Sequence, residues 1–591
     1  MQFLLKNLIY AFAIISFAFQ FAAASTIVVN TVEQLEDAVA AAQPGDSIEV
    51  ADGVYDTEGS ITVYASGTEQ EPIVIRAQNV GMAELTGESY FDFRQCAWIV
   101  LEGFLFTSTD QTVVKLQACN NVRITRNTFR LQETSSLKWV IIQGIWNDPN
   151  ALSHHNRIDH NLFENKLETG NCITVDGTPD PTYISSQYDR IDRNHFRNVG
   201  PRATNEKEAI RVGWSELSMS SGYTVVEYNL FEDCDGDPEI VSVKTSDDTV
   251  RYNTFRRSQG TLSLRHGNRT TVDGNFFLGE NKAGTGGIRV YGDDHVIINN
   301  YFEGLTGNTW DAPIALTNGD YDGGGSLSRH FRINRAIVAH NTLVDNLHHI
   351  EIGFTNNGNY SKPPRDVKVW NNLVVGQQNE LVKLFTQPTN MAWLGNLMHA
   401  DGNATPGISL SDSEIRYADP LLERINNMWK LSATSPAIDS AAVISYSLID
   451  DIDGQLRGAA MDIGADEFST ERVLRQPLTA ADVGPFANDL ITGISPNGET
   501  SIVPTGVKLL QNYPNPFNPS TTLRFKIDRA SFVVLQIFDV DGRRIKTLTR
   551  ERYAAGEYRQ TWNAANIPSG VYIVRLQTAF GERSQKILLL K

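Results

Sequence analysis

The stretch DPEIVSVKTS places two acids and a lysine around a short run of β-branched residues. Asp237 and Glu239 stand one residue apart, and Lys244 closes the run. Twenty-one residues after that lysine, the stretch TLSLRHG closes a similar run with Arg265. Paired carboxylates hold hard cations, whereas lysine and arginine hold anions and transfer protons. The two stretches therefore predict one site for an anionic substrate, in which acids and cations act together.

The cations are expected to share one outer face. Side chains alternate between the two faces of a strand, so Val243 and Leu264 should point inward and Lys244 and Arg265 outward. If the two runs are neighbouring strands, they lie about 4.8 Å apart. The stretches NEKEAIRVG and GGIRVYG add two further arginines. The predicted row of cations is Arg211, Lys244, Arg265 and Arg289, with His266 beside it. Cations on an ordinary solvent-facing surface are the alternative.

The two acids predict a metal site. Hard cations such as calcium bind carboxylate and amide oxygens. The predicted calcium ligands are therefore Asp237 and Glu239, with Asn205 as an amide ligand from a neighbouring coil. The alternative is a solvated acidic turn.

Lysine, arginine and calcium together suit an elimination reaction. In a polysaccharide of uronic acids, the proton at C5 becomes acidic when a cation and an arginine neutralise the adjacent carboxylate. Lys244 could remove that proton, because neighbouring positive charge favours the neutral amine. Arg265 could then protonate the departing glycosidic oxygen or stabilise its charge. The product would carry an unsaturated uronate.

Glycoside hydrolysis is the rival chemistry, because it needs two carboxylates on either side of the bond that breaks. Asp247 and Asp248 are the adjacent candidates. In an extended segment they would point to opposite faces. Two carboxylates on opposite faces cannot act on one glycosidic bond, so the sequence favours elimination over hydrolysis.

The chain of 591 residues carries a formal net charge of −18. This balance argues against nucleic acid as a partner, because phosphate binding requires a basic surface. An anionic polymer would have to be held by a local cluster of cations. The length indicates several domains or a repeat array.

A repeat must position these residues. Short alternating runs end in Asn, any residue, then Phe or Leu, and the tightest spacings are 22 to 25 residues. This period with short strands is typical of a right-handed parallel β-helix, in which Asn stacks at a turn and Phe or Leu stacks in the core. A leucine-rich repeat is the competing solenoid, but its leucine spacing does not occur here. The Asn positions are Asn127, Asn161, Asn194, Asn229, Asn253, Asn275, Asn300, Asn341 and Asn371.

The rest of the chain divides around this repeat. Residues 1–24 are typical of a signal peptide, with an N-terminal membrane anchor as the alternative. A helix within 31–55 should cap the β-helix domain of 25–468. A linker is expected over 469–505 and a small β-sandwich over 506–591. No later stretch is long and apolar enough to span a membrane. Whether Cys96 and Cys119 form a disulfide stays open.

The region 26–468 resembles polysaccharide lyase family 6, which contains alginate lyases and chondroitinase B. The stretches NEKEAIRVG, CDGDPEIVSVK, TLSLRHGN and GGIRVYG carry the resemblance. It implies Lys244 as base and Arg265 as acid. It further implies calcium ligands at Asn205, Asp237 and Glu239, and substrate contacts at Arg211, His266 and Arg289. Asp237 stands where the family usually has the longer Glu.

The tail resembles the C-terminal sorting domain of the type IX secretion system, through NYPNPFNPSTTLRF, DVDGRRI and PSGVYIVRL. That implies the type IX machinery as partner and an extracellular or cell-surface location. A carbohydrate-binding sandwich is the alternative. The sequence as a whole predicts a secreted, calcium-assisted alginate lyase. Dermatan sulfate is the alternative substrate. A solenoid that binds polysaccharide without cleaving it is the alternative from another class of function. The preferred uronate, endo or exo action and the oligomeric state stay open.

Overall fold

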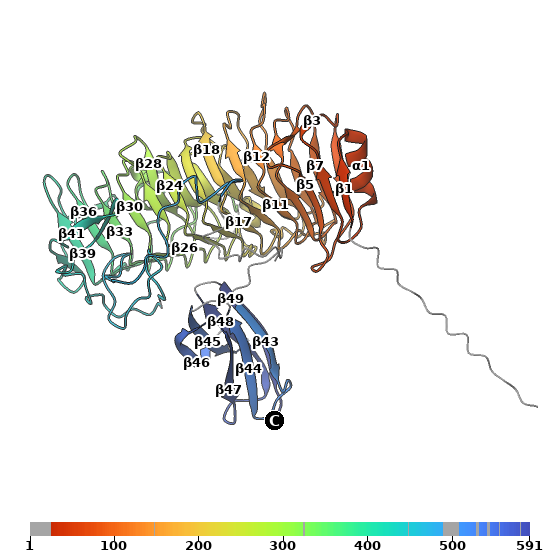
Figure 1. Ribbon diagram of the computed structural model, residues 1–591. Helices are drawn as coiled ribbons and strands as arrows, with labels where there is room; N and C mark the ends of the chain where they lie inside the picture. Colours follow the sequence, from red (N-terminus) through yellow and green to blue (C-terminus); the bar gives the residue numbers. More distant parts are fainter. Residues whose placement is uncertain are drawn as a thin grey trace, which may run out of the picture. The chain divides into compact units, whose positions relative to one another are not determined.

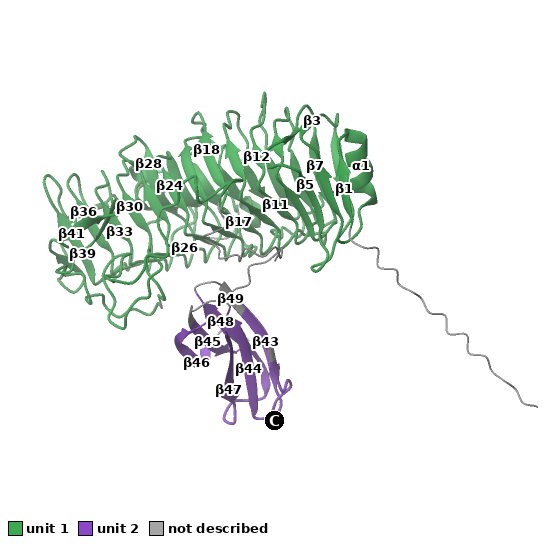
Figure 2. Ribbon diagram, viewed as in Figure 1, with its two compact units in different colours: residues 1–488 green, residues 489–591 purple. Residues whose placement is uncertain are grey.

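The computed structural model describes most of the chain and divides it into two compact units, 1–488 and 489–591 (Figure 2). The residues described are 25–146, 148–322, 326–446, 448–487, 507–527, 531–539, 544–554, 556–578 and 581–591. The predicted signal peptide lies outside these residues. Among the described residues, no helix has the length and apolar character needed to cross a bilayer.

Unit 1 is a parallel β-helix of three long sheets, as predicted (Figure 1). Each coil contributes one strand to each sheet, so neighbours in a sheet are three strands apart in the chain, except at the ends, where β1 pairs with β2 and β39 with β40. Sheet A has 14 strands, from β1 (Thr26–Val29) to β38 (Ala392–Leu394), and sheet B has 14, from β3 (Gly53–Tyr55) to β40 (Ile415–Tyr417).

Sheet C carries the predicted site residues and has 12 strands. They are β4 (Ser60–Val63), β7 (Tyr90–Arg94), β10 (Val114–Gln117), β13 (Val140–Gln143), β16 (Ile173–Val175), β19 (Ile210–Val212), β22 (Glu239–Val243), β25 (Gly260–Leu264), β28 (Thr285–Val290), β31 (Ile314–Leu316), β34 (Ile350–Ile352) and β37 (Val382–Leu384).

A ladder of buried asparagines holds the coils in register. In each step, the Oδ1 atom of one Asn accepts hydrogen bonds from the backbone N–H and Nδ2 of the Asn in the preceding coil, as between Asn194 and Asn229. The amide thus satisfies turn groups that water cannot reach. The ladder runs through Asn127, Asn161, Asn194, Asn229, Asn253, Asn275, Asn300, Asn341, Asn372 and Asn396.

One predicted position in this ladder was wrong, because Asn372 takes the place expected of Asn371. Asn371 has a φ of 53° and occupies the left-handed position just before the ladder. Its Nδ2 donates to the carbonyl of Ala442 instead. The double Asn in this repeat allowed two alignments, and the pattern Asn-x-Leu selected the wrong one.

A stack of phenylalanines fills the core beside the asparagine ladder, as predicted. Neighbouring rings are nearly parallel, with centroids 4.6–4.9 Å apart. That spacing matches the distance between neighbouring strands, so each coil adds one ring. The stack contains Phe106, Phe129, Phe163, Phe196, Phe231, Phe255, Phe277 and Phe302.

Helix α1 (Val32–Ala41) covers the first coils, which confirms the predicted cap (Figure 1). Thr31 caps its N-terminus by accepting a hydrogen bond from the backbone N–H of Gln34. Leu35 and Val39 are buried in the core of the β-helix. The helix thus shields apolar residues that the first coil would otherwise expose.

The thiols of Cys96 and Cys119 lie on neighbouring coils in the buried core. Their sulfur atoms are 3.4 Å apart, and both cysteines are free in this structure.

Residues 469–487, which belong to the predicted linker, lie along the β-helix as a strap. The backbone N–H of Leu478 donates to Oγ1 of Thr254, and that of Gly484 donates to the carbonyl of Arg193. Arg475 is paired with Asp450 at 3.1 Å. The strap therefore contacts coils that are far apart in the sequence.

Unit 2 is a small antiparallel β-sandwich, as predicted (Figure 2). One sheet has the order β43-β44-β47 and the other β46-β45-β48-β49, and both sheets contribute to one buried core. The strands are β43 (Val507–Tyr513), β44 (Ser520–Ile527), β45 (Ser531–Phe538), β46 (Arg544–Tyr553), β47 (Gly556–Asn563), β48 (Gly570–Thr578) and β49 (Gly581–Leu589).

Candidate active site

The predicted cations lie on one face of sheet C, in two rows instead of one. Ser242 on β22 pairs with Arg211 on β19, and Ser263 on β25 pairs with Arg289 on β28. Lys244 and Arg265 follow the ends of β22 and β25 and form a second row, two residues further along the strands. The prediction of a single row was wrong, because Arg211 and Arg289 lie within their strands whereas Lys244 and Arg265 follow the ends of theirs.

The face and the pairing of the two central residues are as expected. Val243 and Leu264 pair with each other and are buried in the core. Alternation along each strand then places Lys244 and Arg265 on the opposite, outer face. The backbone N–H of Arg265 donates to the carbonyl of Val243, which fixes the two cations on adjacent coils.

Glu239 lies among these cations and links the two rows. Its Oε1 atom is 3.8 Å from Nε of Arg265 and 3.4 Å from Nη1 of Arg289. Burial alone would raise the pKa of Glu239, but Lys244, Arg289 and Arg265 lower it below its ordinary value. Glu239 is therefore an anion that fixes the positions of two arginines.

Glu208 is a member of the site that the sequence interpretation missed. Its Oε1 atom is 3.7 Å from Nζ of Lys244, and its Oε2 atom accepts a hydrogen bond from Asn171. The backbone N–H of Ala209 donates to the carbonyl of Ile240, which places Glu208 one coil before Glu239. The signal was available, because Glu208 precedes Glu239 by the same 31 residues that separate Arg211 from its strand partner Ser242.

Asp237 is buried at 3% exposure and accepts hydrogen bonds from the backbone N–H groups of Lys207 and Glu239. Burial and the nearby carboxylates of Glu208 and Glu239 raise its pKa to about 7. These carboxylates repel one another, and a bound cation would relieve that repulsion. The oxygen donors thus fit a hard cation such as calcium.

Asn205, the third predicted ligand, is exposed in the loop before β19. Within the described part of the chain, no three side chains of His, Cys, Asp or Glu converge as a metal site. A cation held by Asp237 and Glu239 would therefore need amide or other oxygen ligands in addition.

The two outer arginines are both held by carboxylates. Nη2 of Arg211 donates to Asp176 at 3.0 Å. Nη2 of Arg289 donates to Asp311 at 2.8 Å, and its Nε donates to the carbonyl of Trp310. These bonds fix both guanidinium groups in place.

His266 is 2% exposed, and its Nε2 atom lies 3.2 Å from Oγ of Ser215. Burial, Arg265 and Lys244 lower its pKa to about 2. The imidazole is therefore neutral at neutral pH and can take part in hydrogen bonds but carries no charge.

The two acids considered for hydrolysis lie apart, as predicted. Asp247 is paired with Arg269 at 2.7 Å near the surface. Asp248 is buried and accepts hydrogen bonds from the backbone N–H of Thr224 and the hydroxyl of Thr245. They do not flank a common position.

The Asp248→Asn variant should be more stable than the wild type above neutral pH. Burial raises the pKa of Asp248 to about 7, so the native state binds more protons than the unfolded state between about pH 4 and pH 7. Stability therefore falls as the pH rises through this window. Asparagine keeps the acceptor for Thr224 and carries no charge.

Melting temperatures at about pH 8 should favour the variant, and the difference should shrink toward about pH 4. A difference that does not change with pH would contradict the raised pKa of Asp248.

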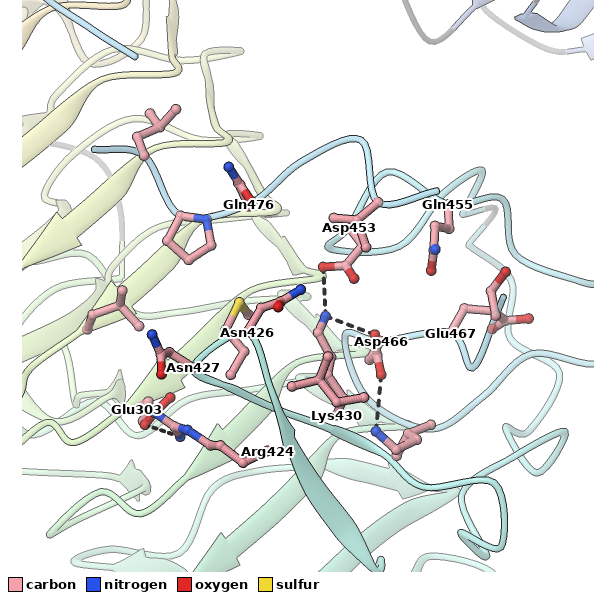
Figure 3. A pocket seen from close by; sticks show the side chains of 18 of the residues that line it. Glu303, Arg424, Asn426, Asn427, Lys430, Asp453, Gln455, Asp466, Glu467 and Gln476 are labelled. Atoms are coloured by element: carbon pink, nitrogen blue, oxygen red, sulfur yellow. Dashed lines mark hydrogen bonds and ion pairs between the residues drawn. The ribbon is translucent and has the colours of Figure 1, made fainter. Parts of the chain in front are cut away.

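A pocket lies on the sheet B side of the β-helix, away from these residues (Figure 3). Its buried Lys430 is paired with Asp453 at 2.6 Å and with Asp466 at 3.0 Å. Arg424 is likewise paired with Glu303. The residues that line this pocket include neither Lys244 nor Arg265, so the predicted chemistry does not lie there.

Comparison with protein families shows which family unit 1 belongs to. Residues 29–438, more than half of the chain, match the family model described as Chondroitinase B. The chain belongs to the chondroitinase B family. This confirms the resemblance seen in the sequence. No curated protein matches this family member.

Solved structures similar to this chondroitinase B family member include polysaccharide lyases. The PL6 family alginate lyase AlyGC has a TM-score of 0.62 at 26% identity, over 77% of this chain and 60% of that chain. A mutant of AlyGC has a TM-score of 0.61 at 28% identity, over 72% of this chain and 60% of its own. The present chain thus spans 60% of the length of AlyGC.

A mannuronic acid specific family 6 lyase from human gut microbiota has a TM-score of 0.56 at 24% identity. It is matched over 67% of this chain and 91% of its own, and at this identity it shows the fold alone.

Residues 511–590 match the model of the secretion system C-terminal sorting domain. This confirms the predicted type IX sorting domain in the chondroitinase B family member. The match indicates secretion to the extracellular space or the cell surface.

Proposed function

We propose that this protein is a secreted polysaccharide lyase that cleaves alginate by β-elimination. The observation that carries the proposal is the placement of Lys244 and Arg265 on adjacent coils of one sheet face, with Glu239 fixing the arginine. The likeness to an alginate lyase structure at 26–28% identity supports alginate as the substrate.

In the proposed reaction, Lys244 removes the proton at C5 of a uronate residue. The C5–H electrons form a C4–C5 double bond while the bond from C4 to the glycosidic oxygen breaks. Arg265 donates a proton to that oxygen or stabilises its charge, and Arg211, His266 and Arg289 bind the substrate.

Asn205, Asp237 and Glu239 would hold a calcium ion, which supplies positive charge beside the uronate carboxylate. Arg265 adds positive charge on the same face of sheet C. Neutralising the carboxylate makes the C5 proton easier to remove.

The test is the ultraviolet absorbance of unsaturated uronate when the purified protein is mixed with alginate or with dermatan sulfate. We expect a rise on alginate. A rise on dermatan sulfate alone would replace the substrate and keep the reaction, since the family model is described as Chondroitinase B. If the protein binds both polymers but releases no product from either, the proposal that it is an enzyme is wrong.

Removal of calcium by a chelator should lower the rate at least about tenfold, because the uronate carboxylate then keeps its charge. Added calcium should restore the rate. It should also raise the melting temperature, since a ligand of the native state stabilises that state.

The Glu239→Gln variant should lose the calcium-dependent change in melting temperature, whereas Asp247→Asn should retain it. Equal rates and equal melting temperatures with chelator and with calcium would exclude the metal.

A further inference from the structure

A chain of aromatic contacts leads from Arg265 toward the C-terminal coils. The Arg265 guanidinium lies 6.0 Å from the ring centroid of Tyr291. The Tyr291 ring is 4.8 Å from that of His330, which is 4.7 Å from that of Tyr360. These contacts join the proposed acid to rings beyond the reacting bond.

The same chain continues through three partly exposed rings. The rings of Tyr360 and Trp310 are 6.4 Å apart. Trp310 packs edge to face against Phe354 at 5.1 Å, and Phe354 against Phe385 at 5.4 Å. Trp310, Phe354 and Phe385 are neither fully buried nor fully exposed. We call this set the aromatic track: Tyr291, His330, Tyr360, Trp310, Phe354 and Phe385.

Strand register places both ends of the track on the outer face of sheet C. Tyr291 follows β28 and Phe385 follows β37, and successive strand pairings make both of them members of the row of Lys244 and Arg265. The positions between them are Thr317 and Gly353. From Arg265 to Phe385 there are four strand steps, about 19 Å.

The far end of the track carries a cation. Lys383 is two residues before Phe385 on the same face of β37, and its Nζ atom lies 5.0 Å from the Phe385 ring centroid. Rings bind the apolar faces of sugars, and an ammonium pairs with a uronate carboxylate. An aromatic surface that ends in a cation therefore suits a chain of uronates.

The row in the opposite direction from Lys244 has a different chemistry. It passes through Gly213, Asp176, Gln143, Gln117 and Arg94. Apart from Gly213, which has no side chain, these residues are polar or charged, and none of them carries an aromatic ring. The two sides of the proposed reaction centre would thus make different contacts with a polymer.

We propose that the partly exposed rings of the aromatic track, together with Lys383, bind the uronate residues on one side of the bond that is cleaved. Tyr291 and Tyr360 are buried and support these rings. The polymer would lie across the coils, along the axis of the β-helix, toward its C-terminal end. This inference rests on the proposed lyase function and adds an extended binding surface to it.

The test compares long alginate with oligouronates too short to extend from Arg265 to Phe385. For Phe385→Ala combined with Lys383→Ala, kcat/KM on long alginate should fall about tenfold or more, mainly through KM. The short substrates should react as with the wild type. The single variant Phe385→Tyr keeps an aromatic ring and should therefore retain most of the wild-type activity on long chains.

Tyr417→Ala is the matched control, because Tyr417 is an exposed aromatic residue of β40 in sheet B. It should leave both substrates unaffected. If the double variant loses kcat/KM equally on long and short substrates, or on neither, the proposed binding role of the aromatic track is wrong. An inactive wild type would instead overturn the proposed lyase.

Discussion

The Lys244→Ala variant should cleave alginate about a thousandfold more slowly than the wild type, because a positioned base contributes roughly two to four powers of ten. The loss should appear in kcat, since the amine acts on the proton as it is transferred. Initial rates of unsaturated uronate release measure this effect, and direct binding of alginate should persist.

Lys368→Ala is the control for Lys244→Ala, because Lys368 is a lysine of sheet A. It should keep the wild-type rate. If Lys244→Ala cleaves alginate as fast as the wild type, Lys244 is not the base, and the proton must leave through another group on this face.

The Asn229→Ala variant should lose about 3–5 kcal/mol of stability, because it leaves several buried groups without partners. The backbone N–H and Nδ2 of Asn194 both donate to Asn229. The carbonyl of Ile191 and the Oδ1 atom of Asn253 both accept hydrogen bonds from its Nδ2. Each buried polar group left unpaired costs about 1–3 kcal/mol.

Denaturant unfolding of the secreted chain measures this loss. Asn79→Ala is the control, because Asn79 is exposed and bonds to Asp52 at the surface. It should change stability by less than about 0.5 kcal/mol. A similarly small effect of Asn229→Ala would show that the ladder does not determine stability.

The repeat made much of the fold predictable. Three short strands and one Asn recur in each coil, with a Phe in most of them, and each physical role follows from residue type and spacing. The register of Lys244 with Arg265 followed for the same reason, since 21 residues separate them without an insertion. Where the spacing is irregular, as at Arg211 and Arg289, the motifs no longer indicate the register.

Other features depend on contacts that sequence patterns do not encode. Glu208 joins the site because a neighbouring coil places it beside Lys244. The strap over 469–487 has the composition of a linker, and its place on the β-helix depends on single backbone hydrogen bonds such as that from Leu478. The position of Phe385 in the row of Arg265 follows only from the pairing of strands that are distant in the chain.

The strap has a consequence for how unit 1 unfolds. A solenoid held by contacts between neighbouring coils can open from one end, one coil at a time. Here Leu478 bonds to the coil of Thr254 and Gly484 to the coil of Arg193, while Nη1 of Arg126 donates to Pro485. Coils that are not neighbours are thereby coupled. The array should melt as a cooperative block, so that the proposed reaction centre is lost in a single transition and not by gradual fraying.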